Sequence, residues 1–205
     1  MKHPASTVLR VVILGALLFA APVWSALNEP QRIIQNVSTE LMRVLREDRT
    51  LLKTDPAYVH RLVDELFLPH VDVSRVSALV LGPYWREATP EQRRLFQREF
   101  QRLLIQTYAS ALDTLSEWEM RFLPMRLEPD ATRTLVRTEV MQPGGQPVRV
   151  DYRMALSDGR WRAYDVAVQE VSLLASYRGQ FTAVAQRSGL DGLLRELQAR
   201  NDTRR

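Results

Sequence analysis

The sequence contains no cysteine and only three histidines. Disulfide bonds, thiolate nucleophiles and cysteine metal sites are therefore excluded, and the folded chain has to be stabilised by packing. His60 and His70 stand ten residues apart and belong to no HExxH-type pattern of metal ligands. We expect no metal site, and we predict that both histidines lie at the surface or cap helices.

Sequence motifs for nucleotide binding and for nucleophilic catalysis are also missing. There is no GxSxG elbow, no phosphate-binding glycine loop and no GxGxxG fingerprint. One catalytic combination remains, in which Asp165 would act as a base beside Tyr152 and Tyr164 on neighbouring strands. The alternative is that Tyr164 packs its ring while Asp165 caps a turn or pairs with an arginine. We favour the alternative and expect no catalytic residue.

Long apolar runs are limited to one short stretch near the N-terminus, residues 11–21, which Lys2 and Arg10 precede. A membrane-spanning helix needs about 20 apolar residues, whereas a positive start, a short apolar run and small residues after it are typical of a signal peptide. We predict a signal peptide over residues 1–25, cleaved near Ser25 or Ala26. The alternative is an uncleaved anchor. A cleaved signal peptide predicts that the mature protein is exported.

The excess of positive charge is small once this segment is set aside. The formal net charge of +4 falls to +2 without Lys2 and Arg10, and acidic residues alternate with the arginines along the rest of the chain. We therefore expect a mixed-charge surface and no nucleic-acid partner. The remaining chain is long enough for one domain with its own core, which we assign to residues 26–200, with a disordered tail over 201–205.

Apolar residues at helical spacing occupy the first half of the chain and its end. Several of these segments begin with a capping residue followed by proline, as at Asp55-Pro56 and Thr89-Pro90. The predicted helices run from Asn28 through Leu45, from Asp55 to before Pro69, from Asp72 to Gly82, from Thr89 through Leu112 and from Ser172 to Gly189, with a short final helix over 190–197.

Between these helices the apolar period changes to two, which indicates strands. The alternating runs cover residues 132–140, 148–156 and 161–168, and turn sequences at 143–145 and 157–159 separate them. We predict an α+β fold in which an antiparallel meander has one face buried under the helices.

Several stretches, in this order, carry a resemblance to a known family. They are Leu-Phe-Leu-Pro-His-Val-Asp at 66–72, Leu-Gly-Pro-Tyr-Trp-Arg at 81–86, Val-Asp-Tyr-Arg-Met at 150–154, Gly-Arg-Trp-Arg-Ala-Tyr-Asp-Val at 159–166, Val-Ser-Leu at 171–173 and Tyr-Arg-Gly-Gln-Phe at 177–181. Together they resemble the MlaC family of periplasmic phospholipid-binding proteins, also called the toluene-tolerance family. The family usually has a glycine at the place of Glu170, so we expect the local geometry to differ there.

The resemblance implies a curved antiparallel sheet of the nuclear-transport-factor-like type, joined to a helical part, with an apolar pocket between them that holds phospholipid acyl chains. It also implies a carrier that shuttles lipid between an outer-membrane lipoprotein–porin complex and an inner-membrane ABC transporter complex, which maintains the lipid asymmetry of the outer membrane. We expect a monomer that has no cofactor and catalyses no reaction.

Inward-facing apolar positions supply our predicted lipid-binding residues, each with ordinary core packing as the alternative. They are Val76, Leu79, Val80, Phe96, Phe100, Leu104, Tyr108, Val150, Tyr152, Val166, Val168, Val171 and Tyr177. Trp85 and Trp161 are expected to anchor the core, and Arg153, Arg162 and Arg178 are candidates for contacts with partners or phosphate. Two other functions stay open: a periplasmic chaperone or adaptor that binds apolar protein segments, and a small exported enzyme that uses Asp165.

Overall fold

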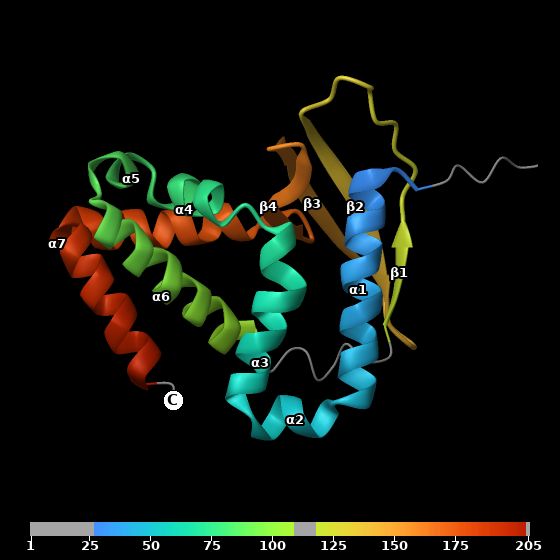
Figure 1. Ribbon diagram of the computed structural model, residues 1–205, viewed down its shortest axis with the longest axis horizontal. Helices are drawn as coiled ribbons and strands as arrows, with labels where there is room; N and C mark the ends of the chain where they lie inside the picture. The colour runs from blue at the N-terminus through green and yellow to red at the C-terminus, as the bar shows by residue number, and fades with distance from the viewer. Residues whose placement is uncertain (1–26, 109–117, 204–205) are drawn as a thin grey trace, which may run out of the picture.

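The computed structural model describes residues 27–108 and 118–203 (Figure 1). Its elements in chain order are α1 (Glu29–Glu47), α2 (Arg49–Thr54), α3 (Pro56–Leu62), the π-helical turn η1 (Val63–Phe67), the 3₁₀ turn η2 (Leu68–His70), α4 (Val73–Leu81), α5 (Pro83–Glu87), α6 (Pro90–Tyr108), β1 (Glu119–Phe122), β2 (Arg133–Met141), β3 (Val148–Ser157), β4 (Arg160–Val168), β5 (Val171–Ser172) and α7 (Leu173–Thr203). The predicted signal peptide and the Leu112 end of the long helix lie outside the described residues. No helix in the described ranges is long and apolar enough to cross a membrane.

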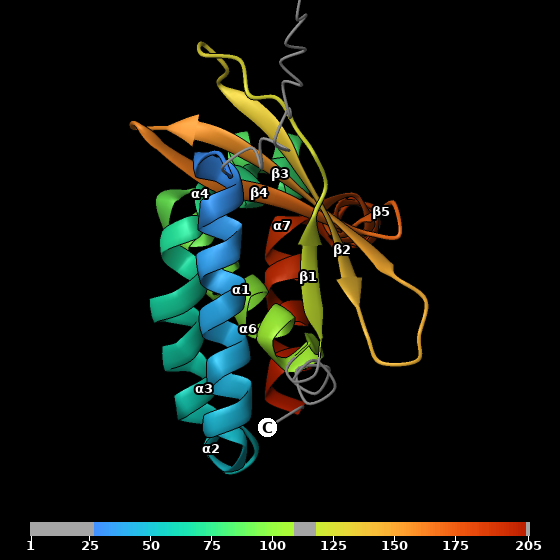
Figure 2. The same cartoon turned by 90° about the vertical axis from the view of Figure 1, so that its right-hand side faces the viewer.

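The five strands form one antiparallel meander in the order β1-β2-β3-β4-β5 (Figure 2). This confirms the predicted α+β class and the curved, unclosed sheet. The β3–β4 hairpin turns at Asp158 and Gly159, whose φ angles are 50° and 70°, and the β4–β5 hairpin turns at Gln169 and Glu170, with 48° and 68°. Two consecutive positive φ angles are the type I′ geometry that matches the twist of the strands. Glu170 therefore occupies a left-handed position, which glycine adopts more readily than a residue with a Cβ.

A β-bulge in β4 changes which residues share a face of the sheet. Met154 pairs with Ala163 but Arg153 pairs with Asp165, so Tyr164 is the extra residue. Directly opposed residues point to the same face, and one extra residue reverses the alternation that follows it. Ala163 therefore faces α1, whereas Asp165 faces away from it.

Helix α1 lies along one face of the sheet and closes the first of two cores (Figure 1). It begins after Asn28, as predicted, and Asn28 also forms a capping box with Gln31 that the sequence analysis did not include. Ile34 packs with buried residues of three strands, and among them Trp161 is 5% exposed. The prediction that Trp161 anchors the core is therefore confirmed.

The second core joins α4, α6 and both limbs of α7, and we call it the helical core. Phe96, Phe100, Tyr177 and Phe181 form its centre, with neighbouring ring centroids 5.1–5.7 Å apart. Trp85 is partly buried against this core. The stacked and edge-on ring contacts add to the free energy gained by burying these large apolar groups.

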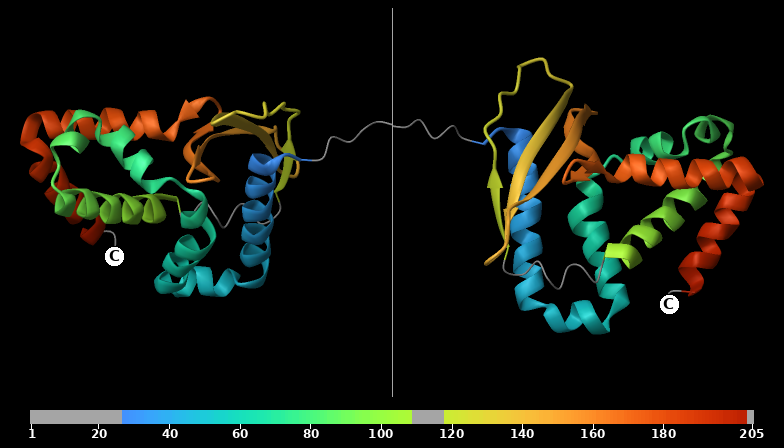
Figure 3. Two further views of the ribbon diagram at one scale, coloured as in Figure 1. Left: turned by 45° about the horizontal axis from the view of Figure 1, so that its top comes forward. Right: turned by 180° about the vertical axis from the view of Figure 1, so that it is seen from behind.

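Helix α7 changes direction at Gly189, where φ is 68° (Figure 3). The sequence predicts this break and the leucine-rich segment that follows it. The predicted tail needs a correction, because the helix continues to Thr203 and Asn201 is fully buried. The Asn201 amide donates hydrogen bonds to the Glu99 carbonyl at 2.9 Å and to Glu99 Oε2 at 2.8 Å, and these bonds hold the second limb of α7 against α6.

Candidate functional site

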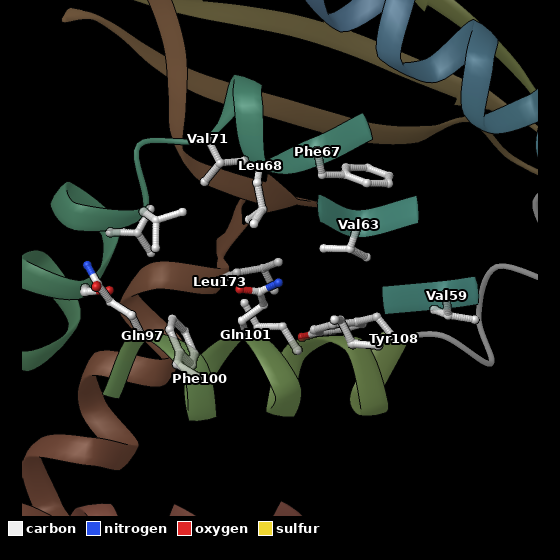
Figure 4. Close-up of a pocket in the computed structure, with 15 residues that line it drawn as sticks. Val59, Val63, Phe67, Leu68, Val71, Gln97, Phe100, Gln101, Tyr108 and Leu173 are labelled. Carbon is white, nitrogen blue, oxygen red and sulfur yellow. The ribbon is translucent and has the colours of Figure 1, made fainter. Parts of the chain in front are cut away.

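An apolar pocket, which we call pocket A, opens between α3, the two irregular turns, α4, α6 and the start of α7 (Figure 4). Its volume is about 370 Å³, within the range of small-molecule sites. The lining residues are Val59, Val63, Phe67, Leu68, Val71, Val73, Val76, Ser77, Gln97, Phe100, Gln101, Leu104, Ile105, Tyr108 and Leu173.

Helix α6 builds the floor of pocket A through its periodicity. Gln97, Gln101, Leu104 and Tyr108 recur three or four residues apart, so they form one stripe on the helix that faces α3 and η1 (Figure 4). Opposite them, the chain is wound as a π-helical turn at η1. Such turns are rare and often occur at functional sites. The wall facing α6 is therefore irregular, while the floor is a regular helix.

The start of α7 is fixed by a buried carboxylate behind the pocket wall. Asp165 accepts hydrogen bonds from the Ser172 hydroxyl at 2.7 Å, from the Leu174 backbone N–H at 3.1 Å and from Arg153 Nη1 at 2.8 Å. These contacts hold the first turn of the helix and so position Leu173, whose side chain lines pocket A.

Among the residues that the structure describes, none that lines pocket A is charged. Its polar side chains are Ser77, Gln97, Gln101 and Tyr108, and the Gln101 amide donates to Asp64 Oδ1 at 2.8 Å. Because none of the described lining residues is charged, pocket A suits an apolar ligand. Outside the pocket, burial, together with a hydrogen bond to Tyr108, raises the pKa of Tyr177 in the helical core to about 12.

A second pocket, pocket B, lies between α1 and the sheet and has a volume of about 480 Å³. It shares Phe67 and Val71 with pocket A, so these two side chains form the partition between the pockets. Its lining includes charged residues, among them Arg46 and Glu119. Tyr152 also lines it, and burial raises the pKa of this tyrosine to about 12, against a smaller lowering by its hydrogen bond with Thr138.

The structure brings seven of the thirteen predicted lipid-binding residues to a pocket wall. Val76, Phe100, Leu104 and Tyr108 line pocket A, and Val150, Tyr152 and Val166 line pocket B.

The other six predicted residues lie outside both pockets. Val80, Phe96 and Tyr177 are buried in the helical core, and Leu79, Val168 and Val171 are 37%, 39% and 61% exposed. As lipid contacts, all thirteen stay predictions.

Sequence reasoning missed the wall formed by Val59, Val63, Phe67, Leu68 and Val71. The prediction of one regular helix from Asp55 to before Pro69 was wrong, because the chain passes from α3 through a π-helical turn to a 3₁₀ turn, which changes the side chains that face α6. The one sequence signal in this part of the wall was the stretch at 66–72 that carries the family resemblance.

The catalytic combination considered from the sequence is not assembled. Tyr152 faces pocket B, Asp165 lies on the opposite face of the sheet, and the Tyr164 ring stacks under Arg75 at 5.5 Å. Asp165 caps α7 and pairs with Arg153, as the structural alternative predicts. Within residues 27–108 and 118–203 no cluster of ligating side chains could hold a metal ion, and His70 lines pocket B.

Two of the three candidate arginines are paired within the protein. Arg153 contacts Asp165, and Arg162 lies 3.8 Å from Asp158, an exposed carboxylate. Arg178 packs near Gly82, with its guanidinium 4.0 Å from the position a Cβ would take on that glycine. Their contacts with partners or phosphate stay predictions.

Comparison with known proteins connects this geometry to a family. The family model "MlaC protein" matches residues 35–199. The chain is 25% identical over 195 residues to the "Intermembrane phospholipid transport system binding protein MlaC" of Haemophilus influenzae, covering 94% of this chain and 90% of the relative. It is 29% identical over 177 residues to "Toluene tolerance protein ttg2D" of Pseudomonas putida, covering 85% of this chain and 82% of the relative.

A solved structure gives the same result at the level of the fold. The phospholipid-binding protein from Ralstonia solanacearum, determined in complex with a phospholipid, superposes with a TM-score of 0.79 at 32% identity, over 85% of this chain and 97% of the other. The family model and the structural superposition each cover most of the chain. The chain therefore belongs to the MlaC family.

Proposed function

We propose that this protein is a periplasmic phospholipid carrier that shuttles lipid between an outer-membrane lipoprotein–porin complex and an inner-membrane ABC transporter complex. It holds an acyl chain in pocket A and catalyses no bond change. The single observation that carries the proposal is an apolar pocket of about 370 Å³ whose lining, within residues 27–108 and 118–203, includes no charged side chain. The names of the H. influenzae and R. solanacearum proteins, which refer to phospholipid transport and phospholipid binding, support it.

The physical chemistry of the pocket is sufficient for this task. Each buried methylene contributes about 0.8 kcal/mol, so an acyl chain with about 14 buried methylenes contributes roughly 10 kcal/mol of transfer free energy. An apolar, uncharged wall is sufficient for the acyl chain to gain this free energy, and no specific bond to the chain is needed. A carrier must also release its cargo, and the irregular wall from η1 to η2 is the part of pocket A with the least regular backbone hydrogen bonding.

Native mass spectrometry of the purified mature protein tests the proposal, combined with extraction and identification of the bound lipid. We expect a discrete added mass that corresponds to a phospholipid. Protein that carries no lipid and takes none from phospholipid vesicles would contradict the carrier function. Apolar protein segments recovered in place of lipid would favour the chaperone alternative.

A charge placed in pocket A is the matching genetic test. Ile105→Glu introduces a carboxylate on the α6 wall, where a buried charge opposes apolar contents, and we expect loss of lipid loading. Leu51→Glu is the control, because Leu51 is 45% exposed on α2, borders neither pocket and is not among the predicted lipid-binding residues. Thermal melting establishes that both variants are folded. Full loading of a folded Ile105→Glu variant would exclude pocket A as the lipid site.

A further inference from the structure

Ser77 on α4 has a buried hydroxyl group without a partner in the wall of pocket A. The residue is 1% exposed, and its Oγ makes no hydrogen bond with any group in the described part of the chain. Because a buried hydroxyl that gives up its hydrogen bonds to water destabilises the fold, such a group needs an explanation.

Other helical serines of this protein show what Ser77 does not do. Serine inside a helix commonly donates to the carbonyl four residues earlier. Ser38 donates to the Ile34 carbonyl at 2.8 Å, Ser176 to the Ser172 carbonyl at 2.9 Å and Ser188 to the Val184 carbonyl at 3.0 Å. Ser77 lacks this bond, and its Oγ is buried within the wall, so a rotation about its Cα–Cβ bond is needed for it to donate to a molecule bound in pocket A.

The surroundings of Ser77 decide which chemical group it can meet. The described residues that line pocket A include no cation, so an ionised phosphate would lose its hydration there without compensation from them. A neutral hydrogen-bond acceptor at the end of an apolar chain avoids the cost of removing a charge from water. In a phospholipid, this acceptor is the ester carbonyl at the start of each acyl chain. Gln97, which is half-buried on α6, lies at the α4 end of the pocket and adds an amide to the same region (Figure 4).

We propose that Ser77 selects for ester-linked lipids by donating a hydrogen bond from its Oγ to an acyl ester carbonyl of the bound phospholipid. This inference rests on the proposed function, because it presupposes a phospholipid in pocket A. An ether-linked lipid of the same chain length and headgroup lacks the carbonyl and leaves the hydroxyl without a partner. A neutral hydrogen bond of this kind favours the ester lipid by about 3- to 10-fold.

The test uses vesicles that contain equal amounts of a diacyl phosphatidylglycerol and its dialkyl ether analogue. The full mature protein is loaded from these vesicles, and native mass spectrometry gives the ratio of the two bound lipids. We expect the ratio of bound ester lipid to bound ether lipid to be about 3- to 10-fold higher in the wild type than in Ser77→Ala. The variant should melt at the same or a higher temperature, because it removes an unsatisfied polar group.

Ser38→Ala is the matched control, because Ser38 lines pocket B and its hydroxyl already donates to the backbone. It should keep the wild-type ratio, and a ratio that changes as in Ser77→Ala would overturn the assignment to Ser77. An identical ratio in wild type and Ser77→Ala, with lipid bound in both, would overturn the inference and leave the carrier function intact. No bound lipid of either kind in the wild type would overturn both.

Discussion

Helix α6 separates two largely apolar regions that differ in packing, the filled helical core and the open pocket A. On one face, Phe96 and Leu103 are fully buried in the helical core. On the other, Leu104 and Ile105 line pocket A, and Phe100 belongs to both regions. The core is filled because α7 packs directly against α6, whereas α3 and η1 stand across a pocket from it (Figure 4). Apolar side chains thus make a core or a pocket depending on the distance to the opposing element.

The largest effect that this comparison predicts is on stability. Phe96→Ala should lower the free energy of unfolding by about 3–5 kcal/mol, because a fully buried ring is replaced by a cavity that the close-packed surroundings cannot fill. Ile105→Ala on the pocket wall should cost about 1 kcal/mol or less, since its side chain already borders a cavity. Urea unfolding measures both. Equal losses in the two variants would remove the distinction between core and pocket.

An enlarged side chain gives the next largest effect. Val80→Phe should destabilise the protein by about 1–3 kcal/mol, because Val80 has no free space around it. Val76→Phe, one turn earlier on α4, can extend into pocket A with little change in stability and should reduce lipid loading severalfold. Thermal melting and native mass spectrometry separate the two outcomes. Wild-type loading by Val76→Phe would mean that this part of the pocket holds no lipid.

The wall of pocket B makes stability depend on pH. Because burial raises the pKa of Tyr152 to about 12, this tyrosine stays protonated in the folded protein while the unfolded chain ionises near pH 10. The stability that it contributes is complete below pH 10. It is lost as pH rises to about 12, at up to about 1.4 kcal/mol per pH unit.

Urea unfolding at several pH values from 9 to 12 tests this prediction. Tyr152→Phe should make the free energy of unfolding fall less steeply with pH. Tyr177→Phe, in the helical core, should have a similar effect, because the pKa of Tyr177 is also raised to about 12. An unchanged slope in Tyr152→Phe would show that its hydroxyl is hydrated in pocket B.

The smallest effect lies outside both regions, in the β4–β5 hairpin. Glu170→Gly should stabilise the protein by about 0.5–1 kcal/mol, because φ is 68° there and a residue with a Cβ is strained in that conformation. The exposed contact with Arg149 at 3.3 Å contributes little. Glu170→Ala removes that contact and retains the strain, so it should not stabilise. Equal melting temperatures for Glu170→Ala and Glu170→Gly would contradict this explanation.

Several features of the fold could be predicted because they depend on local rules. The capping residues Asn28 and Asp72 begin the helices that they were expected to begin, and Gly189 breaks α7 where the pattern changes. The alternating strands and the type I′ turn at Asp158-Gly159 follow from period and turn chemistry. The short helices α2 and α5 were missed, because segments of five or six residues have too few turns for a period to show.

The arrangement of the site depends on contacts that no local rule contains. The extra residue Tyr164 in β4 turns Asp165 away from Tyr152, and neither residue type predicts a bulge. The π-helical turn that carries Val63 and Phe67 to the pocket has no regular spacing in the sequence. Phe96 and Tyr177, which were predicted to contact lipid, are apolar residues at helical spacing, just like the residues that line pocket A. They are buried because α7 packs against α6, and the sequence pattern does not contain this contact.

The sequence by itself determined the α+β class, the order of helices and strands, the absence of thiol chemistry and the membership of a lipid-binding family. Only the tertiary structure decided which apolar faces are filled, which border a pocket, and that Ser77 is the buried hydroxyl without a partner in pocket A. The physical reason is that an apolar side chain lowers the free energy when it leaves water, whether it packs against a neighbouring side chain or against a bound lipid. The choice between them is therefore set by how far apart the helices are held.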